Sequence, residues 1–206
     1  IAFAERFERV VSLERDEILA EVVRENLRRM GVANVEVVTT SAEEYIATCN
    51  ERFDWVYADP DRRTADGKRV VRLEDCSPDM VALYPALGRI TERVAIKNSP
   101  LFDVEEAFRL FGQCGVEVIS LGGECKEVNI YIDGSAPRLS AVAIGMSEFS
   151  CSVDERNSAK WSSQPNDLSQ YRYITLPDVA LQHARMVATA FEGKCDVWSN
   201  NGVALS

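Results

Sequence analysis

Two acidic residues directly follow short apolar runs that read as β-strands. Glu14 comes after the run at residues 10–13, and Asp59 comes after the run at residues 53–58. In open α/β sheets, a carboxylate at the end of a strand often accepts both ribose hydroxyls of a nucleoside cofactor. We interpret Glu14 as this cofactor contact. The alternative is an exposed acid that stabilises the start of a helix through its dipole.

The loop that begins at Asp59 is the second candidate for chemistry. Its residues are Asp59, Pro60, Asp61, Arg62 and Arg63. An acid followed by a proline at this edge of a sheet resembles the motif with which amino-group methyltransferases hold the substrate nitrogen, although the aromatic residue of that motif is absent. A similar form occurs in enzymes that methylate carbon 5 of RNA pyrimidines, but those need a cysteine where this chain has Lys97 and Asn98. The remaining alternative is an ordinary turn after a strand.

Composition and charge narrow the classes of protein. Hydrophobic residues make up 46% of the 206 residues, and no apolar run approaches the roughly 20 residues needed to cross a bilayer. The net charge of −10 argues against a broad basic surface that binds nucleic acid. One local basic patch is a candidate substrate contact, with a solvated loop as the alternative. It comprises Arg62, Arg63, Lys68, Arg69 and Arg72.

Two further features of the sequence are the spacing of its cysteines and the identity of its first residue. Six cysteines lack CxxC spacing, and the one histidine, His183, reads as a surface or packing residue within a helix. We therefore expect no metal site and reduced thiols, as in the cytoplasm. The chain starts at Ile1 without a secretory signal, so we expect it to be part of a longer protein.

Apolar runs alternate with helical stretches from Arg9 to about Gly134, which predicts βαβ units and a mostly parallel sheet. Strands are expected at residues 10–13, 35–38, 53–58 and 93–97. Helices are expected to begin at Asp16, at a capping box of Ser41 and Glu44, at Pro78, and at a second box of Asp103 and Glu106.

Two further strands, residues 116–121 and 128–132, are joined by a connector that begins Gly122-Gly123. Since a parallel crossover needs a dozen or more residues, these strands must be antiparallel. A parallel sheet with this ending is typical of class I methyltransferases and unusual in nicotinamide-dependent oxidoreductases. The predicted fold class is therefore α/β, with a Rossmann-like sheet that ends in an antiparallel hairpin.

A second, small α+β domain is expected over residues 135–206. It begins with a strand at residues 139–144 and continues through a polar linker at residues 150–169, rich in Ser, Asn, Asp and Gln. A strand, a helix and a strand are then expected at residues 171–176, 178–191 and 195–198. Trp161, within the linker, is either a docking anchor or loosely held.

An ordered series of segments resembles the bacterial THUMP-like class I S-adenosylmethionine-dependent methyltransferases. The segments are 56–63, 67–68, 73–78, 96–103 and 123–127. The resemblance implies a ferredoxin-like C-terminal domain and S-adenosylmethionine as cofactor. It implies that Glu14 holds the ribose, and that Ser41 and Ala42 lie at the adenine. Ser41 is equally well explained as a helix cap.

The same resemblance implies an acceptor site formed by Asp59, Pro60 and Arg62. Asp59 would also border the cofactor and accept a hydrogen bond from the acceptor, while Lys97 would neutralise an anionic substrate group. The expected activity is direct methyl transfer without a metal, to an unidentified acceptor that could be RNA. The alternative is a methyltransferase-like module that binds a nucleoside or RNA and has lost catalysis. The oligomeric state is left open.

One part of the family pattern has no counterpart in the sequence. The first core strand and its glycine-rich loop are missing from residues 1–134, because residues 1–7 read as the tail of the following helix. In the family this strand lies between the strands that end at Glu14 and Asp59, whose carboxyl ends share one edge. We therefore expect these two strands not to pair with each other, and another strand to fill the position between them.

Overall fold

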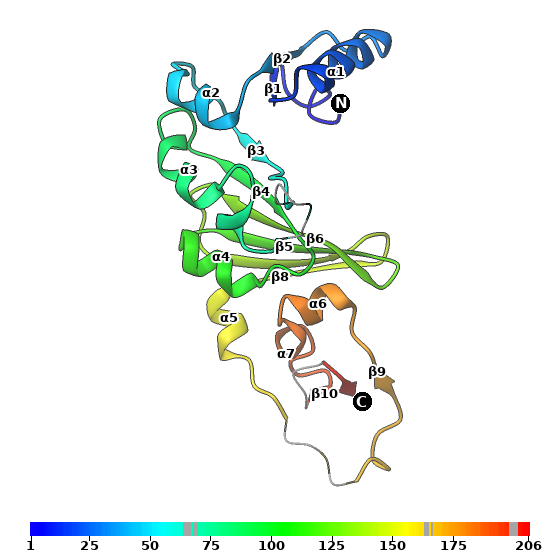
Figure 1. The fold of residues 1–206 in the computed structure, drawn as a ribbon. Coiled ribbons are helices and arrows are strands. Elements are labelled where there is room, and N and C mark those ends of the chain that lie inside the picture. The colour runs from blue at the N-terminus through cyan, green and yellow to red at the C-terminus, as the bar shows by residue number, and fades with distance from the viewer. Residues whose placement is uncertain (64–66, 68–69, 163–164, 166, 198–201) are drawn as a thin grey trace. The chain divides into compact units, whose positions relative to one another are not determined.

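The computed structural model describes residues 1–63, 67, 70–162, 165, 167–197 and 202–206 (Figure 1). The chain divides into two compact units. Residues 1–52 and 83–90 form the first unit, and residues 53–82 and 91–206 form the second.

The first unit is built on two parallel strands joined by a helix. β1 (Val10–Glu14) pairs with β2 (Val35–Thr39), so that Glu14 lies opposite Thr39. The connecting helix α1 (Glu17–Arg29) is capped by the Asp16 carboxylate, which accepts from two backbone amides of its first turn. The next helix, α2 (Ala42–Thr48), begins at the capping box of Ser41 and Glu44. These elements confirm the predicted βαβ unit.

The apolar stripe of α1 is largely exposed. Ile18 is 76% exposed and Val22 is 50% exposed, whereas Ala20 is the buried residue of this helix. A two-stranded sheet offers little apolar surface against which a helix of 13 residues can pack. An exposed apolar helix face of this kind usually marks a surface that another element covers.

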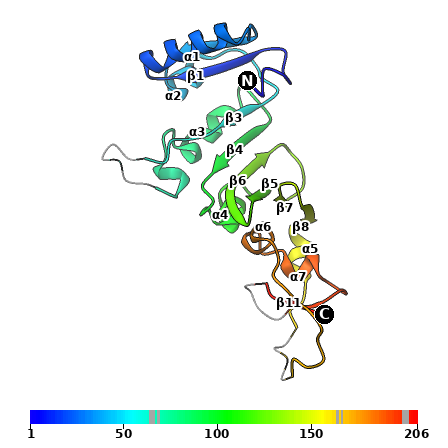
Figure 2. The same cartoon turned by 90° about the vertical axis from the view of Figure 1, so that its right-hand side faces the viewer.

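The second unit contains a six-stranded sheet in the order β3-β4-β6-β5-β7-β8. Its strands are β3 (Val56–Ala58), β4 (Val94–Asn98), β5 (Gly115–Leu121), β6 (Glu124–Ile132), β7 (Arg138–Ala143) and β8 (Ser147–Ser152). β3 and β4 are parallel, and β6 is antiparallel to both of its neighbours, β4 and β5 (Figure 2). The prediction of an antiparallel hairpin is confirmed.

The strands that end at Glu14 and Ala58 do not pair with each other. Among the described strands, β1 pairs with β2, β3 pairs with β4, and the two pairs belong to different sheets. Direct pairing would have contradicted the expected strand order. The structure is therefore compatible with a further strand beside β1.

The two faces of the six-stranded sheet differ in polarity. One face is apolar and fully buried at positions such as Ile96, Val118, Ile130 and Leu139. Helix α6 (Val179–His183) lies over this face, where its N-cap residue Asp178 accepts a hydrogen bond from the Ser120 hydroxyl. The opposite face carries polar side chains, of which Lys97, Glu117 and Ser140 are half-buried.

The sheet continues beyond residue 134, where a domain boundary was expected. β7 pairs in parallel with β5, and β8 pairs with β7. Residues 150–158, expected as the start of a linker, instead form the end of β8 and the helix α5 (Val153–Ser158). The polar composition misled the prediction because an edge strand tolerates polar residues, and because Ser152 and Glu155 form a capping box.

The helix expected at residues 178–191 is two short helices. α6 is followed by α7 (Val187–Ala190), and Arg185 between them has a left-handed φ of 57°. A three-stranded sheet completes the region in the order β10-β11-β9, with β9 (Ile174–Thr175), β10 (Asp196–Val197) and β11 (Ala204–Leu205). Trp198, expected in the last strand, lies outside the described residues. The ferredoxin-like assignment of this region stays a prediction.

Two predicted helix starts are corrected. α3 (Met80–Leu87) begins after Asp79, whose carboxylate accepts from the Val81 and Ala82 amides, and not at Pro78. The Ser77–Pro78 peptide bond is cis, and η1 (Leu73–Asp75) precedes it. Asp103 caps α4 (Val104–Phe111) as expected, but the Glu106 side chain bonds to Arg109 and forms no capping box.

Candidate functional site

The end of β3 and the end of β4 bring two predicted site residues together. Lys97 Nζ lies 3.2 Å from Asp59 Oδ1 and 3.1 Å from Asp59 Oδ2. The contact follows from the parallel pairing of the strands, in which Ala58 lies opposite Ile96. Because both side chains keep contact with solvent, the ion pair holds the two groups in position more than it stabilises the fold.

The loop after Asp59 is anchored by its backbone. Pro60 is buried, and Asp61 forms an antiparallel bridge with Ser77, with N–H···O distances of 2.8 and 2.9 Å. The Arg62 carbonyl accepts a hydrogen bond from the Val70 amide at 2.9 Å. The loop that carries the predicted acceptor-site residues is thus tied down at several points.

Arg62 lies near a buried thiol. Burial raises the pKa of Cys76, and the positive charge of Arg62 opposes this shift. The rest of the proposed basic patch is not assembled among the described residues: Arg72 pairs with Glu74 at 3.3 Å, while Lys68 and Arg69 lie outside the described residues. Arg62 and Arg63 directly follow Asp61 in the same loop, and the Arg63 amide donates to Asp61 Oδ1 at 3.1 Å.

A polar row across the sheet was not predicted. Lys97 lies opposite Asn129, and Asn129 lies opposite Glu117, so these side chains share one face. Asn129 is only 9% exposed and donates to Glu117 at 3.3 Å and to Glu127 at 3.2 Å. The signal in the sequence was the alternation of Glu127, Asn129 and Tyr131 with apolar residues in β6.

Two tyrosines border this row. Tyr131 donates to Glu117 Oε2 at 3.0 Å, and burial together with the Glu117 charge raises its pKa. Burial also raises the pKa of Tyr57, with smaller contributions from the Asp59 and Glu127 carboxylates. Both phenols therefore stay protonated near neutral pH, and the Tyr131 proton is held in its hydrogen bond to Glu117.

The predicted cofactor residues occupy the corresponding edge of the first unit. Glu14 ends β1, and its Oε1 accepts from the Asp16 amide at 2.9 Å. Its backbone carbonyl accepts from the Thr40 amide, just ahead of Ser41 and Ala42. One carboxylate oxygen of Glu14 thus has a place in the turn, and the second can accept from a ligand.

Ser41 has a structural role. Its hydroxyl accepts from the Glu44 amide at 3.2 Å, and Glu44 returns a bond to the Ser41 amide. Ala42 is the first residue of α2 and is half-buried. Glu14, Ser41 and Ala42 therefore share the carboxyl edge of β1 and β2, while Asp59, Pro60 and Lys97 share that of β3 and β4.

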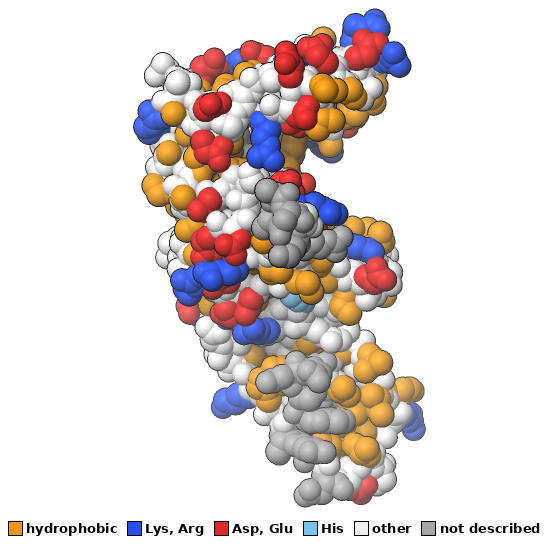
Figure 3. All heavy atoms as spheres, viewed as in Figure 1, with side chains coloured by type: hydrophobic (Ala, Val, Ile, Leu, Met, Phe, Trp, Pro, Cys, Tyr) orange, Lys and Arg blue, Asp and Glu red, His pale blue; other side chains and the backbone are white. Residues whose placement is uncertain are grey.

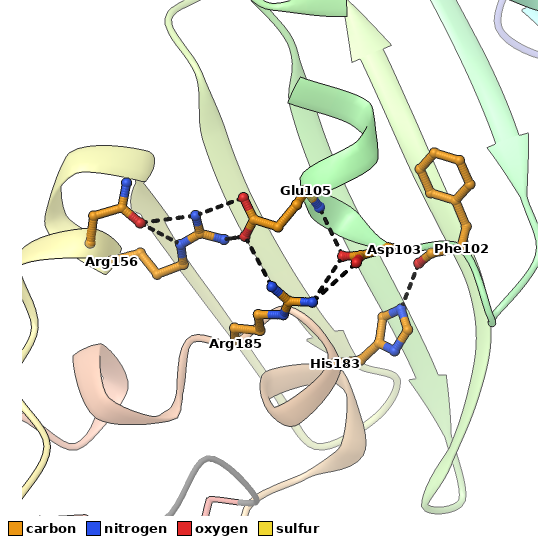
Figure 4. A network of polar contacts seen from close by, with 7 residues as sticks. Phe102, Asp103, Glu105, Arg156, His183 and Arg185 are labelled. Carbon is orange, nitrogen blue, oxygen red and sulfur yellow. Dashed lines mark hydrogen bonds and ion pairs between the residues drawn. The ribbon is translucent and has the colours of Figure 1, made fainter. Parts of the chain in front are cut away.

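A network of ion pairs stands apart from both groups (Figure 4). Arg156 pairs with Glu105, and Arg185 pairs with Asp103 at 3.1 Å and with Glu105 at 3.8 Å. His183 Nε2 lies 2.9 Å from the Phe102 carbonyl oxygen, so the imidazole has a specific partner that its sequence context did not indicate. The network joins α4, α5 and the turn between α6 and α7.

The six thiols are free, and burial raises the pKa of Cys114 to about 11. Within the described ranges, no group of three or more His, Cys, Asp or Glu side chains has the geometry to hold a metal ion. In the same part of the chain, no helix combines the length and apolar character that a membrane crossing requires.

Comparison with known proteins supports the fold. No protein-family model and no curated protein sequence matches the chain. The structure is similar to the crystal structure of a "putative methyltransferase" from Porphyromonas gingivalis W83, with a TM-score of 0.80 and 21% identity over 100% of this chain and 53% of that chain. The chain therefore spans about half the length of that protein. At this identity the similarity shows a methyltransferase-like α/β fold.

Proposed function

We propose that the chain belongs to a class I S-adenosylmethionine-dependent methyltransferase. The observation that carries the proposal is the position of β6, which is inserted antiparallel between β4 and β5. An antiparallel strand inserted in this way distinguishes the methyltransferase sheet from that of nicotinamide-dependent enzymes. The similarity to the Porphyromonas gingivalis protein over the full chain supports it.

Glu14 would hold the cofactor's ribose. One oxygen of its carboxylate fixes the side chain by accepting from the Asp16 amide. The second oxygen can accept hydrogen bonds from the ribose hydroxyls. The Ser41 hydroxyl is used by the helix cap, so its region would contribute to adenine binding through Ala42 and through backbone groups at the start of α2. When bound, the cofactor would supply an electrophilic methyl group.

Asp59, Pro60, Arg62 and Lys97 would form the acceptor side. Lys97 holds the Asp59 carboxylate in one orientation, so Asp59 can accept a hydrogen bond from an acceptor N–H or O–H. Buried Pro60 and the Asp61–Ser77 bridge would keep this loop in place. Arg62 would face an anionic part of the acceptor. RNA is one acceptor class that we propose to test, in a cytoplasmic setting.

A further strand would pair with the open edge of β1. The Val10 amide donates to the Asn34 carbonyl and the Thr40 amide to the Glu14 carbonyl, so the even-numbered residues of β1 face β2. The Val11 and Leu13 amides then point to the opposite edge, where buried unpaired amides would be costly. The exposed stripe of α1 supports the same conclusion.

A binding module without catalysis is the second candidate. Both oxygens of Asp59 accept from Lys97, which leaves this carboxylate less able to act on an acceptor. Such a module would bind S-adenosylmethionine without transferring its methyl group.

Calorimetric titration of the full-length protein with S-adenosylmethionine and with NAD tests the proposal. We expect binding of the first ligand, and Glu14→Ala should weaken it while Glu192→Ala, an exposed acid on another unit, should not. Binding of NAD alone would contradict the assignment. Methyl transfer from labelled cofactor to RNA or protein fractions then separates the enzyme from the binding module.

A further inference from the structure

A neutral amide lies among charged side chains on the polar face of the six-stranded sheet. Lys97 of β4 lies opposite Asn129 of β6, and Asn129 lies opposite Glu117 of β5. Glu127 precedes Asn129 by two positions in β6, so it belongs to the same face. Asp59 follows β3 and contacts Lys97. One ammonium group therefore shares this part of the sheet with three carboxylates.

The length of the lysine side chain does not by itself select one of these carboxylates. Adjacent strands are about 4.8 Å apart, and diagonal neighbours on adjacent strands are about 7–8 Å apart. Because lysine and glutamate side chains are long and flexible, both Glu117 and Glu127 are within reach of Lys97. The chain has 33 Asp and Glu residues against 23 Lys and Arg residues, and Figure 3 shows acidic and basic side chains next to one another on its surface. A specific partner for Lys97 therefore needs a further cause.

Lys97 pairs with the most exposed of the three acids. Its Nζ donates to Asp59 Oδ1 at 3.2 Å and to Asp59 Oδ2 at 3.1 Å, although the Asp59 side chain is 49% exposed. Glu117 and Glu127 are half-buried. Attraction between opposite charges is stronger where water is excluded. If all three acids were equally free, the ammonium group would therefore be expected on one of the glutamates.

The Asn129 side chain accounts for this choice. It is 9% exposed, and its Nδ2 donates to Glu117 Oε2 at 3.3 Å and to Glu127 Oε1 at 3.2 Å. Both hydrogen atoms of the amide are thus used, one for each carboxylate. The Tyr131 hydroxyl donates a further hydrogen bond to Glu117 Oε2 at 3.0 Å. Neutral donors therefore hold the two glutamates, and neither needs the lysine as its partner.

Other types of side chain would not have this effect at position 129. A carboxylate there would lie directly opposite Lys97, with Cβ atoms about 4.5–5.5 Å apart, and would itself attract the ammonium group. An apolar side chain would leave the two half-buried glutamates without their shared donor, and a carboxylate in that condition favours a nearby cation. The amide supplies two donors and adds no charge.

We propose that Asn129 is a positioning residue that keeps the Lys97 ammonium group on Asp59, because its amide holds Glu117 and Glu127. Asn129 thereby acts on the acceptor side through Lys97. Its effect on methyl transfer rests on the proposed function, whereas the choice of partner by Lys97 does not.

Asn129→Asp tests the proposal with a side chain of nearly the same shape. The substitution removes the two donors and places a carboxylate opposite Lys97, so Lys97 Nζ should move to the new carboxylate. Crystal structures of the full-length protein and of the variant measure the distance from Lys97 Nζ to the Asp59 oxygens, which should exceed about 4 Å in the variant. Asn157→Asp, which adds the same charge at an exposed position of this unit, is the control and should leave the pair in place.

Methyl transfer from labelled S-adenosylmethionine distinguishes positioning from a structural role. With the RNA or protein fraction that the natural protein labels as acceptor, Asn129→Asp should lower kcat about tenfold, as Lys97→Met should. The dissociation constant of S-adenosylmethionine should stay unchanged. In the Lys97→Met background, Asn129→Asp should have no further effect, because Asn129 acts through Lys97. An equal loss of kcat in both backgrounds would overturn the proposal.

A second variant keeps the test decisive if Asn129→Asp unfolds the sheet. Asn129→Ala should draw Lys97 towards Glu117 or Glu127, and the addition of Glu117→Gln and Glu127→Gln should return it to Asp59, because no competing charge remains. A Lys97–Asp59 contact that persists in Asn129→Ala, or in folded Asn129→Asp, would overturn the proposal. Failure of the natural protein to bind S-adenosylmethionine would contradict the proposed function, while the distances in the crystal structures would still decide the partner of Lys97.

Discussion

Asp59 and Lys97 meet across adjacent parallel strands, where Lys97 Nζ lies 3.1 Å from Asp59 Oδ2 although 38 positions separate them in the sequence. The contact puts an acid from the loop after β3 beside a cation at the end of β4. Polar residues of β6 continue from this pair across the sheet, because Lys97 lies opposite Asn129. The proposed acceptor side is thus one end of a longer polar row.

Lys97→Met should affect function more than stability. The ion pair is partly exposed, so its loss should change the free energy of unfolding by less than about 1 kcal/mol. Asp59 would lose the partner that orients it, so methyl transfer should fall by about tenfold or more. Urea unfolding and a labelled-cofactor assay check the two effects. Lys126→Met, which breaks an exposed pair with Glu124, is the control and should change neither.

Glu14→Ala should weaken the binding of S-adenosylmethionine by about 1–3 kcal/mol, the range for hydrogen bonds to a charged group. Because the Asp16 side chain still caps α1, the variant should keep its helix content. Calorimetry measures the affinity and circular dichroism the helix content. An unchanged dissociation constant would exclude Glu14 from the cofactor site.

The Asp133–Arg138 pair should make stability depend on pH. Hydrogen bonds from Arg138 hold the pKa of Asp133 at about 2, below the ordinary value of 3.8. The contribution to stability is therefore complete above about pH 4 and is lost as the pH falls towards 2. Arg138→Gln should lower the stability at pH 6 by about 1 kcal/mol, allowing for the partial exposure of Arg138.

Urea unfolding at pH 6 and at pH 2 checks this prediction. The difference between the natural chain and Arg138→Gln should be smaller at pH 2, because about half of the Asp133 carboxyl groups are then protonated in the natural chain and most of them in the variant. A difference that is equal at both pH values would show that Arg138 acts through packing at Gly115, where its guanidinium fills the space that a Cβ would need, and not through the charge of Asp133.

Leu139→Ala should destabilise the whole second unit. Leu139 in β7 is fully buried and lies opposite Val116 of β5, so its truncation leaves a cavity in the main sheet and should cost about 2–5 kcal/mol. Val142→Ala, on the partly covered face of the same strand, is the control and should cost less. If Leu139→Ala melted only the region after residue 134, β7 would belong to a separate domain.

The open edge of β1 should be visible in hydrogen exchange. In a monomeric chain of residues 1–206, the Val11 and Leu13 amides should exchange at least about tenfold faster than those of Ser12 and Glu14, which bond to β2. Pairing of a further strand with β1 should slow them. NMR combined with a measurement of mass in solution checks this. Equally slow exchange of all four amides in a monomer would contradict the proposed strand.

Several elements could be predicted because their causes are local in sequence. The cap at Asp16, the capping box of Ser41 and Glu44, and the antiparallel β5–β6 hairpin each depend on residues a few positions apart. The sequence pattern therefore predicted the fold class and the ends of the strands that carry Glu14 and Asp59. The local pattern also led to a wrong prediction, because the polar residues of β8 and α5 suggested a linker.

The tertiary structure decided which distant residues meet. Strand order placed Lys97 beside Asp59 and Asn129, and parallel pairing with β5 placed β7 in the main sheet. The break between α6 and α7 at Arg185 could not be predicted either, because residues 178–191 have a helical pattern throughout. The ion pair that accompanies this turn is with Asp103, 82 positions earlier in the sequence. Such contacts depend on how the elements pack, and the residues next to each partner in the sequence do not indicate them.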